Sequence, residues 1–405
     1  MADAMAYAGV SGDDDLDFIT RCTCLAFGMS ADAGARWVRL FPADWRILRD
    51  GDGTRVACAM ANALGQHLGG AALPGVGVAG VAVLPEHRGK GHAKTLMAEL
   101  LREAAGGGRL LALLYASTQS LYRAVGFEQA GHCFKVRIPL AELALSVGRR
   151  TPEGLRLAPL PRGVPDEVRA LSRAFARLYN GPLDRGPYTW ARVETVRGDE
   201  RQGYGAYGPG GALEGYVYLA QTSMLSPAGS ELVISDVAFT TPAAARALLR
   251  YLTTFATIAK EVTFTAGPSH PLLLLLREQS FTVTRYENWM LRLLRVEDAL
   301  RARGYPASSV EPFVVEVDDD LLPWNRGRFA LSSRGGAVSV AAPGPGEAAA
   351  GPALRLHVRA LAMLVTAYYS ASQLAALGLV EGEAPALARA DALFAGTAPW
   401  MSDMF

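Results

Sequence analysis

The fold of this chain is decided by residues Gly80 to Ala105, which read GVAVLPEHRGKGHAKTLMAELLREAA. The apolar run Val81 to Leu84 predicts a strand, Pro85 ends it, and the amphipathic residues from Lys90 onward predict a helix. Two glycines and two basic residues stand around the turn between them. Glycines let a backbone approach an anion, and free N–H groups at a helix start point toward it. The stretch therefore predicts a cradle for the diphosphate of a phosphorylated carrier.

Two other glycine-rich turns fit these residues less well. A Rossmann turn needs G-x-G-x-x-G beside the first strand, but Lys94 stands where the third glycine belongs after Gly89 and Gly91. A P-loop needs a Lys-Ser/Thr pair at a spacing that is missing here. The purely structural alternative is a helix start that packs on a sheet and binds no ligand. The combination of glycines, basic residues and Pro85 favours the anion cradle over that alternative.

Composition and charge exclude several classes of protein. The 405 residues include 40 Lys plus Arg and 39 Asp plus Glu, a net charge of +1. Such a balance argues against nucleic acid or an acidic membrane as the main partner. The chain shows neither a secretory signal pattern nor an apolar run long enough to span a bilayer. We therefore expect a soluble, cytoplasmic protein. The histidines and cysteines lack zinc-site spacing, so we also expect that the protein needs no metal.

The order of predicted elements divides the chain into three domains. Residues 1–150 form an α/β domain whose sheet is covered on both sides. Residues 151–294 repeat the order strand, helix, strand, helix, strand without the glycines, which predicts an internal duplication whose second copy lost its phosphate turn. Residues 295–405 combine a hairpin-rich sheet with helices, as in an α+β module. In the second copy, Pro268 to Gln279 is predicted to be a helix, and in the third domain Ala342 to Pro352 is predicted to be a mobile loop.

The glycine-rich turn also resembles a known superfamily. The spacing Arg88-x-x-Gly91-x-Ala93, after Val-x-Val and Pro85, is similar to that of the GNAT acetyltransferases. The resemblance implies that the strand backbone pairs with the pantetheine amides of acetyl-CoA and that the turn holds its pyrophosphate. It also implies that the N–H group of Val83 polarises the thioester carbonyl. The implied cofactor contacts are Val81, Ala82, Val83, His87, Arg88, Gly89, Lys90, Gly91, His92 and Ala93, with Ser117 as a lesser candidate.

A tyrosine follows the next predicted strand. Tyr122 falls where many GNAT proteins place a general acid beside the coenzyme A sulfur. A phenol at hydrogen-bond distance can protonate the thiolate that develops there. The alternative is an amphipathic residue that closes a short helix on the sheet. The family context favours the acid.

Three further features resemble the enhanced intracellular survival (Eis) family of N-acetyltransferases: the degenerate second copy, the segment that opens at Val296, and the terminus Ala398-Pro-Trp400…Phe405. The implied fold class is α/β (α+β), with two fused GNAT-like mixed-sheet domains followed by a sterol-carrier-protein-like α+β domain. The implied assembly is a hexamer. In this family the α-carboxylate of a terminal Phe accepts the proton of the attacking amine. That residue is Phe405 here.

The acceptor is less defined than the cofactor. The residues after Phe27 lack the acid expected in the family's amine pocket, and Met404 rather than an acid precedes the last residue. We expect Phe27, Trp37 and Asp403 to border the acceptor, a small molecule with a primary amine that is aminoglycoside-like, a polyamine or lysine-like. The alternatives are a non-catalytic protein that binds or senses acyl-CoA, and an enzyme that transfers a longer acyl chain.

Overall fold

The computed structural model describes residues 5–147, 154–196, 199–222, 230–341 and 351–405. The chain forms two compact units. Unit 1 comprises residues up to Ala130, Trp289–Thr397 and Phe405, and unit 2 comprises Gly131–Asn288 and Ala398–Met404. The division falls inside two long strands, β6 and β15, rather than at residues 150 and 294. The three-domain boundaries therefore stay a prediction.

The first part of unit 1 is a mixed sheet with the strand order β1-β2-β3-β4-β5-β15. The strands from β1 to β4 pair antiparallel, β4 pairs parallel with β5, and the end of β15 pairs antiparallel with β5. The elements are β1 (Ala6–Gly9), α1 (Asp13–Phe27), α2 (Ala31–Leu40), β2 (Trp45–Arg49), β3 (Arg55–Leu68), β4 (Ala71–Val83), α3 (His92–Gly106), β5 (Leu111–Tyr115), α4 (Gln119–Arg123) and β15 (Thr282–Leu293).

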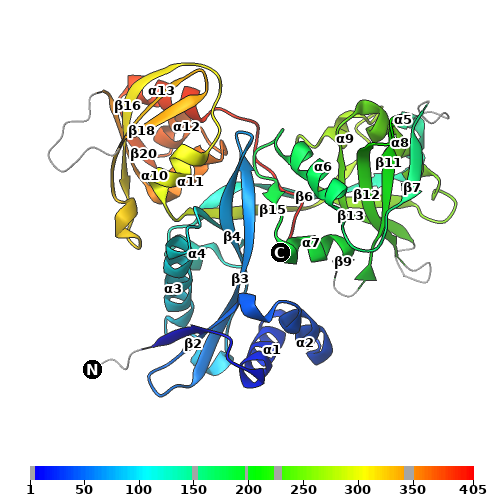
Figure 1. Cartoon of the computed structure of the whole chain (residues 1–405). Coiled ribbons are helices and arrows are strands. Elements are labelled where there is room, and N and C mark those ends of the chain that lie inside the picture. The colour runs from blue at the N-terminus through cyan, green and yellow to red at the C-terminus, as the bar shows by residue number, and fades with distance from the viewer. Residues whose placement is uncertain (1–4, 148–153, 197–198, 223–229, 342–350) are drawn as a thin grey trace. The chain divides into compact units, whose positions relative to one another are not determined.

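Helices cover both faces of this sheet, as its apolar strands require. Helix α3 lies along one face, and α1 and α2 lie on the other (Figure 1). Leu96, Met97, Leu100 and Leu101 repeat at helical spacing and are buried against β3, β4 and β5. Each such side chain stabilises the fold by about 1.5–3 kcal/mol when it is fully buried.

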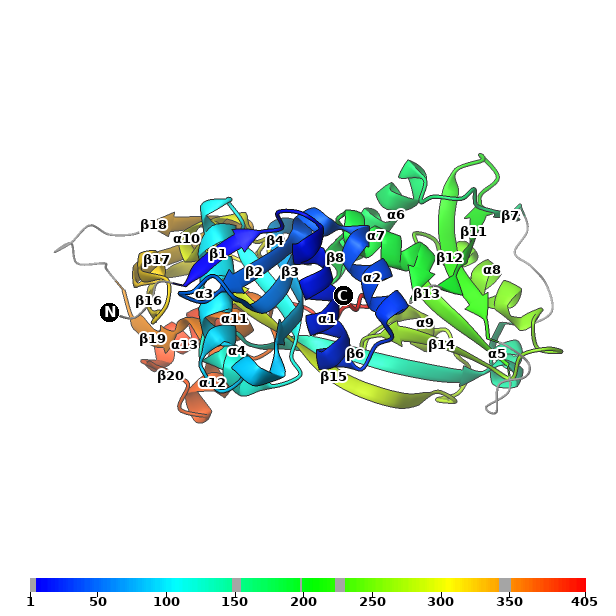
Figure 2. The ribbon, with the colours of Figure 1, turned by 90° about the horizontal axis from the view of Figure 1, so that it is seen from below.

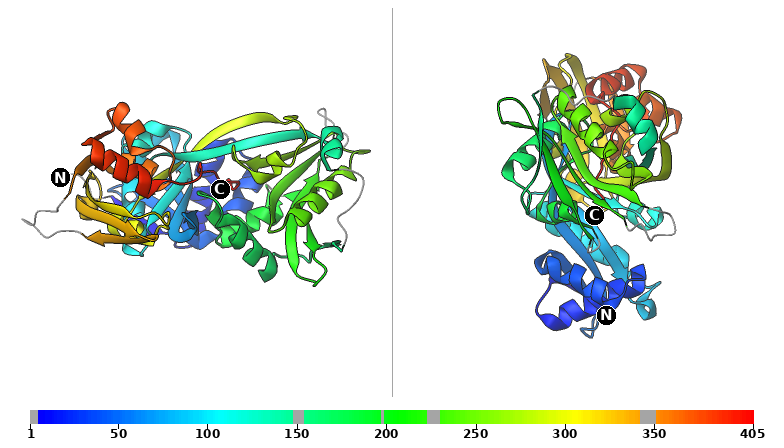
Figure 3. Two further views of the ribbon diagram at one scale, coloured as in Figure 1. Left: turned by 90° about the horizontal axis from the view of Figure 1, so that it is seen from above. Right: turned by 90° about the vertical axis from the view of Figure 1, so that its right-hand side faces the viewer.

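The second part of unit 1 is a smaller α+β structure. Its five strands follow the order β18-β17-β16-β19-β20, and helices α11, α12 and α13 pack on them (Figure 3). The elements are α10 (Val296–Ala302), β16 (Val310–Asp318), β17 (Gly327–Arg334), β18 (Ala337–Ala341), β19 (Ala353–His357), α11 (Val358–Val365), α12 (Ala371–Ala376), β20 (Val380–Gly382) and α13 (Ala384–Phe394).

Unit 2 is built on mixed-sheet strands in the order β6-β14-β13-β12-β11-β7. Helices α6 and α7 lie to one side of these strands, and α5 and α8 lie to the other (Figure 2). Along β12, Tyr216 and Tyr218 pack with α6 and α7, whereas Val217 and Leu219 pack with α5 and α8. The elements are β6 (Glu128–Pro139), α5 (Leu140–Val147), β7 (Arg156–Pro159), α6 (Asp166–Ala176), β8 (Leu183–Asp184), α7 (Pro187–Glu194), β9 (Thr195–Val196), β10 (Asp199–Glu200), β11 (Gln202–Tyr207), β12 (Leu213–Gln221), β13 (Glu231–Phe239), α8 (Pro242–Thr253), β14 (Glu261–Ala266) and α9 (Pro271–Leu274).

One predicted helix is wrong in length. The helix expected over Pro268 to Gln279 is the single turn α9. Five consecutive leucines would make every side of a helix apolar, but this segment packs on one surface only: Leu272 is buried and Leu274 is 83% exposed. Most of the loop predicted over Ala342 to Pro352 lies outside the described residues. No helix in the described part of the chain is long and apolar enough to cross a bilayer.

Candidate active site

The site in unit 1 begins where β4 leaves its neighbour. Strand β4 pairs with β5 only over Gly75–Gly77, and no other described strand pairs with that edge of β4 further along. On its other edge, β4 has a bulge at Gly80, which has φ +59° and stands opposite the register shift between Cys58 and Met60 of β3. The end of β4 therefore offers an open strand edge within the sheet.

The hydrogen-bond pattern gives the direction of the free backbone groups. The N–H of Leu84 donates to the carbonyl of Val56 in β3 at 3.2 Å. Because successive residues of a strand alternate, the N–H and carbonyl of Val83 face the open edge, and those of Ala82 face β3. The Val83 carbonyl accepts from Arg88 Nε at 3.2 Å, which is consistent with this direction. The N–H of Val83 is thus directed to a ligand on the open edge, and that of Ala82 is not.

The predicted cradle follows directly. A 3-10 turn (Pro85–His87) leads to Gly89 and Gly91, with φ of +78° and +83°, and α3 begins at His92. No described side chain caps this helix start, and Arg88, Gly89, Lys90 and Gly91 are exposed. The first N–H groups of a helix have no partner within it. The residues present therefore fit a diphosphate, which needs exposed N–H donors and basic side chains.

Two histidines flank the cradle. The rings of His87 and His92 lie 6.1 Å apart. Burial, with the nearby charges of His87 and Lys90, lowers the pKa of His92, so this imidazole is neutral at pH 7. His92 is buried at the first position of α3, and Ala93 is half-buried behind it. The electrostatic attraction for an anion thus comes from Arg88, Lys90 and the backbone.

Tyr122 lies on α4, close behind the end of β5. Its ring is buried against the core formed by α3 and the sheet and lies 6.0 Å from the ring of Phe127. Within the described residues its hydroxyl has no hydrogen-bond partner. Burial raises the pKa of Tyr122 to about 12, so the hydroxyl keeps its proton at neutral pH. Ser117, the lesser candidate, is exposed between β5 and α4.

Aromatic side chains border the bulge of β4. Phe27 packs edge-on to Trp37 at 6.1 Å, and Trp37 packs edge-on to the buried Trp45 at 5.2 Å. A Cβ atom at Gly80 would lie 2.6 Å from the ring of Trp45 and 3.0 Å from that of Trp37. The structure therefore brings Trp37 next to the bulge, and Phe27 packs on the ring of Trp37. Gly80 is needed there both for its positive φ and for the approach of these rings.

An open depression lies between α1 and the start of α2. Its volume is about 580 Å³, and its lining includes Cys24 and Leu25. Two charged side chains line it as well, but Asp17 is paired with Arg39 at 2.9 Å and Arg21 with Glu86 at 3.6 Å. The depression therefore presents largely neutralised charge.

Phe405, the last residue, is half-buried in unit 1. Its ring lies edge-on to that of Tyr115, at the end of β5, with the centroids 5.8 Å apart. The same strand end leads into Ser117 and α4. The chain terminus is thus held on the strand whose continuation carries Tyr122.

The residues before Phe405 are fixed within unit 2. The backbone of Trp400 donates to Asn180 at 2.9 Å, and that of Met401 to His132 at 3.1 Å. Arg192 donates to the carbonyl of Met404 at 2.7 Å. A chain end with these bonds does not fray as most termini do.

Asp403 belongs to a buried ion network. Arg185, 5% exposed, donates to Asp403 at 2.6 Å and to both carboxylate oxygens of Asp236 at 2.7 and 2.8 Å. The hydroxyl of Tyr216 donates to Asp236 at 2.6 Å. Burial raises the pKa of Asp403, although Arg185 opposes this shift. The structure gives Asp403 a role in fixing the C-terminal segment, and its role as an acceptor ligand stays a prediction.

Arg185→Met should destabilise unit 2 strongly. The change leaves Asp236 and Asp403 buried without their cation, and breaking a buried pair costs about 3–5 kcal/mol. Urea unfolding of the full chain measures the loss. Arg162→Met, which removes an exposed pair with Glu200, is the matched control and should change stability by less than about 1 kcal/mol. Equal losses in the two variants would contradict the role of the network.

Three residues of these arrangements were missed by the sequence interpretation. A glycine within a strand pattern is a signal for a bulge, and it could have identified Gly80. The contacts of Tyr115 and Arg185 join residues far apart in the chain, and no local pattern marks them. No group of three or more His, Cys, Asp or Glu residues that could hold a metal occurs among the described residues.

Three family models match successive parts of the chain. A GNAT acetyltransferase domain matches residues 10–130, another GNAT acetyltransferase domain matches residues 181–296, and a sterol carrier protein domain matches residues 296–402. The predicted duplication and the predicted fold class are confirmed: two GNAT domains precede a sterol-carrier-protein-like domain.

Individual proteins are similar over most of the chain. An uncharacterized N-acetyltransferase of Streptomyces avermitilis is 30% identical over 355 residues, 84% of this chain and 82% of the relative. The N-acetyltransferase Eis of Mycobacterium tuberculosis is 29% identical over 386 residues, 91% of each chain. The crystal structure of a GCN5-related N-acetyltransferase from Anabaena variabilis matches with a TM-score of 0.90 and 30% identity, over 99% of this chain and 100% of that chain.

Proposed function

Since this chain belongs to the GNAT superfamily of N-acetyltransferases, and within it to the Eis family, we propose that it acetylates a primary amine of a small molecule with acetyl-CoA. The observation that carries the proposal is the open edge of β4, which leads into the exposed, uncapped start of α3. An extended amide chain can pair with the open edge of β4, and a diphosphate can bind at the start of α3.

We assign each part of acetyl-CoA to a different set of residues that would bind it. We assign the pantetheine amides to the backbone of Val81 and Val83, with Ala82 between them as a spacer. We assign the diphosphate to the N–H groups and side chains from His87 to Ala93, among which Arg88 is oriented by the Val83 carbonyl. We assign a further contact to Ser117, which is exposed between β5 and α4.

The chemistry divides between two groups of the protein. Acetyl-CoA, when bound, supplies an activated thioester and a thiolate leaving group. The α-carboxylate of Phe405 accepts the proton of the acceptor amine, and the N–H of Val83 stabilises negative charge on the carbonyl oxygen. Tyr122, protonated at neutral pH, donates its phenolic proton to the departing sulfur. Much of the acceleration comes from holding these groups in place.

Gly91→Val should weaken acetyl-CoA binding. A β-branched residue at φ +83° carries about 1–3 kcal/mol of backbone strain and would distort the turn, so we expect the Kd to rise about tenfold or more. Calorimetry measures the change. Gly108→Val is the matched control, since Gly108 follows the C-terminal end of α3 with φ +76° and equal free space. A similar loss of affinity in both variants would count against the cradle.

The acceptor follows from what surrounds the bulge of β4. Phe27 and Trp37 provide aromatic faces, while Asp13 and Asp17 are paired with Arg39. A polycationic acceptor gains most from free carboxylates. We therefore place lysine-like amines with an apolar body above the two polycationic classes, the polyamines and the aminoglycoside-like amines. Only the family resemblance supports assembly as a hexamer.

Thiol release over a panel of amines tests the proposal, with mass measurement of each product. We expect coenzyme A release and a mass gain of one acetyl group on at least one amine. Calorimetry with acetyl-CoA and longer acyl-CoAs accompanies it. Binding without release for every amine would favour the acyl-CoA-binding alternative. Faster release from longer acyl-CoAs would favour transfer of a longer chain.

A further inference from the structure

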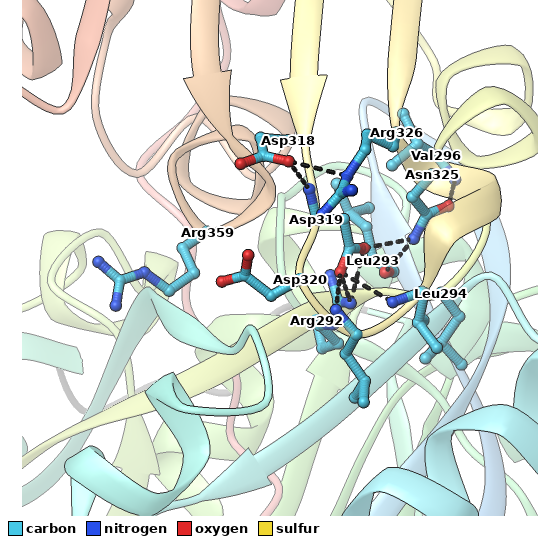
Figure 4. Close-up of polar contacts among 12 residues, drawn as sticks. Arg292, Leu293, Leu294, Val296, Asp318, Asp319, Asp320, Asn325, Arg326 and Arg359 are labelled. Carbon is cyan, nitrogen blue, oxygen red and sulfur yellow. Dashed lines mark hydrogen bonds and ion pairs between the residues drawn. The ribbon is translucent and has the colours of Figure 1, made fainter.

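A buried ion pair in unit 1 lies beneath the turn that follows α4. Arg292, on β15, is fully buried, and its Nη2 donates to both carboxylate oxygens of Asp319 at 2.6 and 2.7 Å (Figure 4). Its Nε and Nη1 have no hydrogen-bond partner among the described residues. A buried ion pair adds little stability over apolar packing of the same volume, so its presence points to a role in fixing geometry.

Asp319 is itself held by the sterol-carrier-protein-like domain. Its carboxylate accepts from the backbone of Leu321 and Leu322 at 3.0 and 3.1 Å, and from Asn325 Nδ2 at 2.9 Å. Asn325 in turn accepts from the backbone of Val296 at 2.8 Å. Figure 4 shows Asp319 between Arg292 and Asn325, whereas the carboxylate of Asp318 pairs with Arg326 and accepts from the backbone N–H of Asp319 at 3.0 Å, a bond that an Asn oxygen can keep. The turn between β16 and β17 thus fixes the carboxylate that holds Arg292.

The guanidinium of Arg292 supports the turn after α4. A Cβ atom at Gly126, whose φ is +90°, would lie 2.7 Å from Cζ and Nε of Arg292. The same turn is closed by the carbonyl of Tyr122, which accepts from the backbone of Val125 at 3.1 Å and of Phe127 at 3.0 Å. A displacement of Gly126 is therefore transmitted to Tyr122 through two hydrogen bonds.

A second connection reaches the same helix. Arg123, the residue after Tyr122, pairs with Glu128 at 2.7 Å. Arg359, on α11 of the sterol-carrier-protein-like domain, approaches the same carboxylate at 3.7 Å. That domain is thus connected to α4 and its turn twice, by Asp319 through Arg292 and by Arg359 through Glu128.

We propose that Arg292 and Asp319 are positioning residues for Tyr122, through which the sterol-carrier-protein-like domain sets the place of the phenol in the acetyltransferase site. The inference rests on the proposed acid role of Tyr122. The ion pair fixes the turn at Gly126, the turn fixes the carbonyl of Tyr122, and the hydroxyl is held at the place of the leaving sulfur.

The first experiment compares two neighbouring substitutions in the full chain. Asp319→Asn keeps the shape of the side chain but removes its charge, and we expect kcat to fall about 10- to 100-fold, as misplacement of a reacting group does. The KM for acetyl-CoA should change by less than about twofold. Asp318→Asn, with a side chain 59% exposed, is the control and should keep its activity. Equal effects of the two substitutions would overturn the proposal.

The second experiment asks whether the effect passes through Tyr122. In the Tyr122→Phe background, Asp319→Asn should cause little further loss, because the phenol that it positions is gone. An equal loss in both backgrounds would contradict the proposal. If Asp319→Asn fails to fold, Gly126→Ala takes its place, since the added methyl group displaces the guanidinium.

Hydrogen exchange separates this proposal from the acid role itself. The amides of Val125 and Phe127 should exchange faster in Asp319→Asn than in the natural chain or in Asp318→Asn. Unchanged exchange would overturn the positioning of the turn, whatever the kinetics. If Tyr122→Phe alone leaves kcat unchanged, the acid role fails, and the exchange of these two amides alone reports whether the ion pair holds the turn.

Discussion

A chain that ends at Met404 should release coenzyme A about 10²- to 10⁴-fold more slowly than the natural chain, the range that a general base contributes. The α-carboxylate of Phe405 is the proposed acceptor of the amine proton, and the new terminus at Met404 lies one residue short of it. The backbone up to Met404 is held by Arg192 and by the pairing of Trp400 and Met401, so the fold should persist. Thiol release at saturating amine measures the loss.

Two controls separate the carboxylate from the aromatic ring. Phe405→Leu keeps the carboxylate and an apolar side chain but loses the ring contact with Tyr115, so it should be clearly more active than the chain that ends at Met404. One glycine added after Phe405 keeps the ring and moves the carboxylate, so it should be nearly inactive. Urea unfolding should give the same stability for all variants. A C-terminally tagged chain with full activity would disprove the role of the carboxylate.

Tyr122→Phe should lower kcat by about 10²- to 10⁴-fold and leave the KM for acetyl-CoA within about twofold. The substitution removes only the hydroxyl, which has no hydrogen-bond partner among the described residues, and keeps the ring in its buried place. Stability should therefore be unchanged, which urea unfolding checks. Tyr7, half-buried on the edge strand β1 and away from the proposed site, donates its hydroxyl to Glu103; Tyr7→Phe is the control and should keep kcat. An unchanged kcat for Tyr122→Phe would reject the acid role.

The pH dependence follows from the same side chain. Burial raises the pKa of Tyr122 to about 12, so its proton is present throughout the neutral and mildly alkaline range. The rate should not fall between about pH 7 and pH 10 through ionisation of this group, whose unperturbed pKa is about 10. Because the folded pKa is raised, the protonated phenol stabilises the fold below about pH 10, and this stabilisation is lost as the pH rises through about 12.

Local chemistry explains what the sequence predicted well. The cradle was predicted because glycines, Pro85 and a helix start stand within a few residues of each other. The strand predicted at Val81 is part of β4, and the helix predicted after Lys90 is α3, because apolar periodicity and the turn residues between them mark both elements. The apolar pattern predicted the wrong helix length around Leu272 to Leu276, where consecutive leucines leave no polar face that could mark the bounds of a helix.

Contacts between distant residues explain what the sequence did not predict. Arg185 pairs with Asp236 over 51 positions and with Asp403 over 218, and Arg292 pairs with Asp319 over 27. None of these pairs lies within one helical turn or one hairpin, so no spacing rule marks them. The end of β15 beside β5 is a further example, because its partner precedes it by well over a hundred residues.

A crystal structure with bound acetyl-CoA would show whether the turn before α3 holds the diphosphate. We expect the diphosphate on the N–H groups between Arg88 and Ala93, the pantetheine amides along the backbone of Val81 and Val83, and the sulfur beside the hydroxyl of Tyr122. A diphosphate bound elsewhere, with the open edge of β4 left without a ligand, would contradict this expectation.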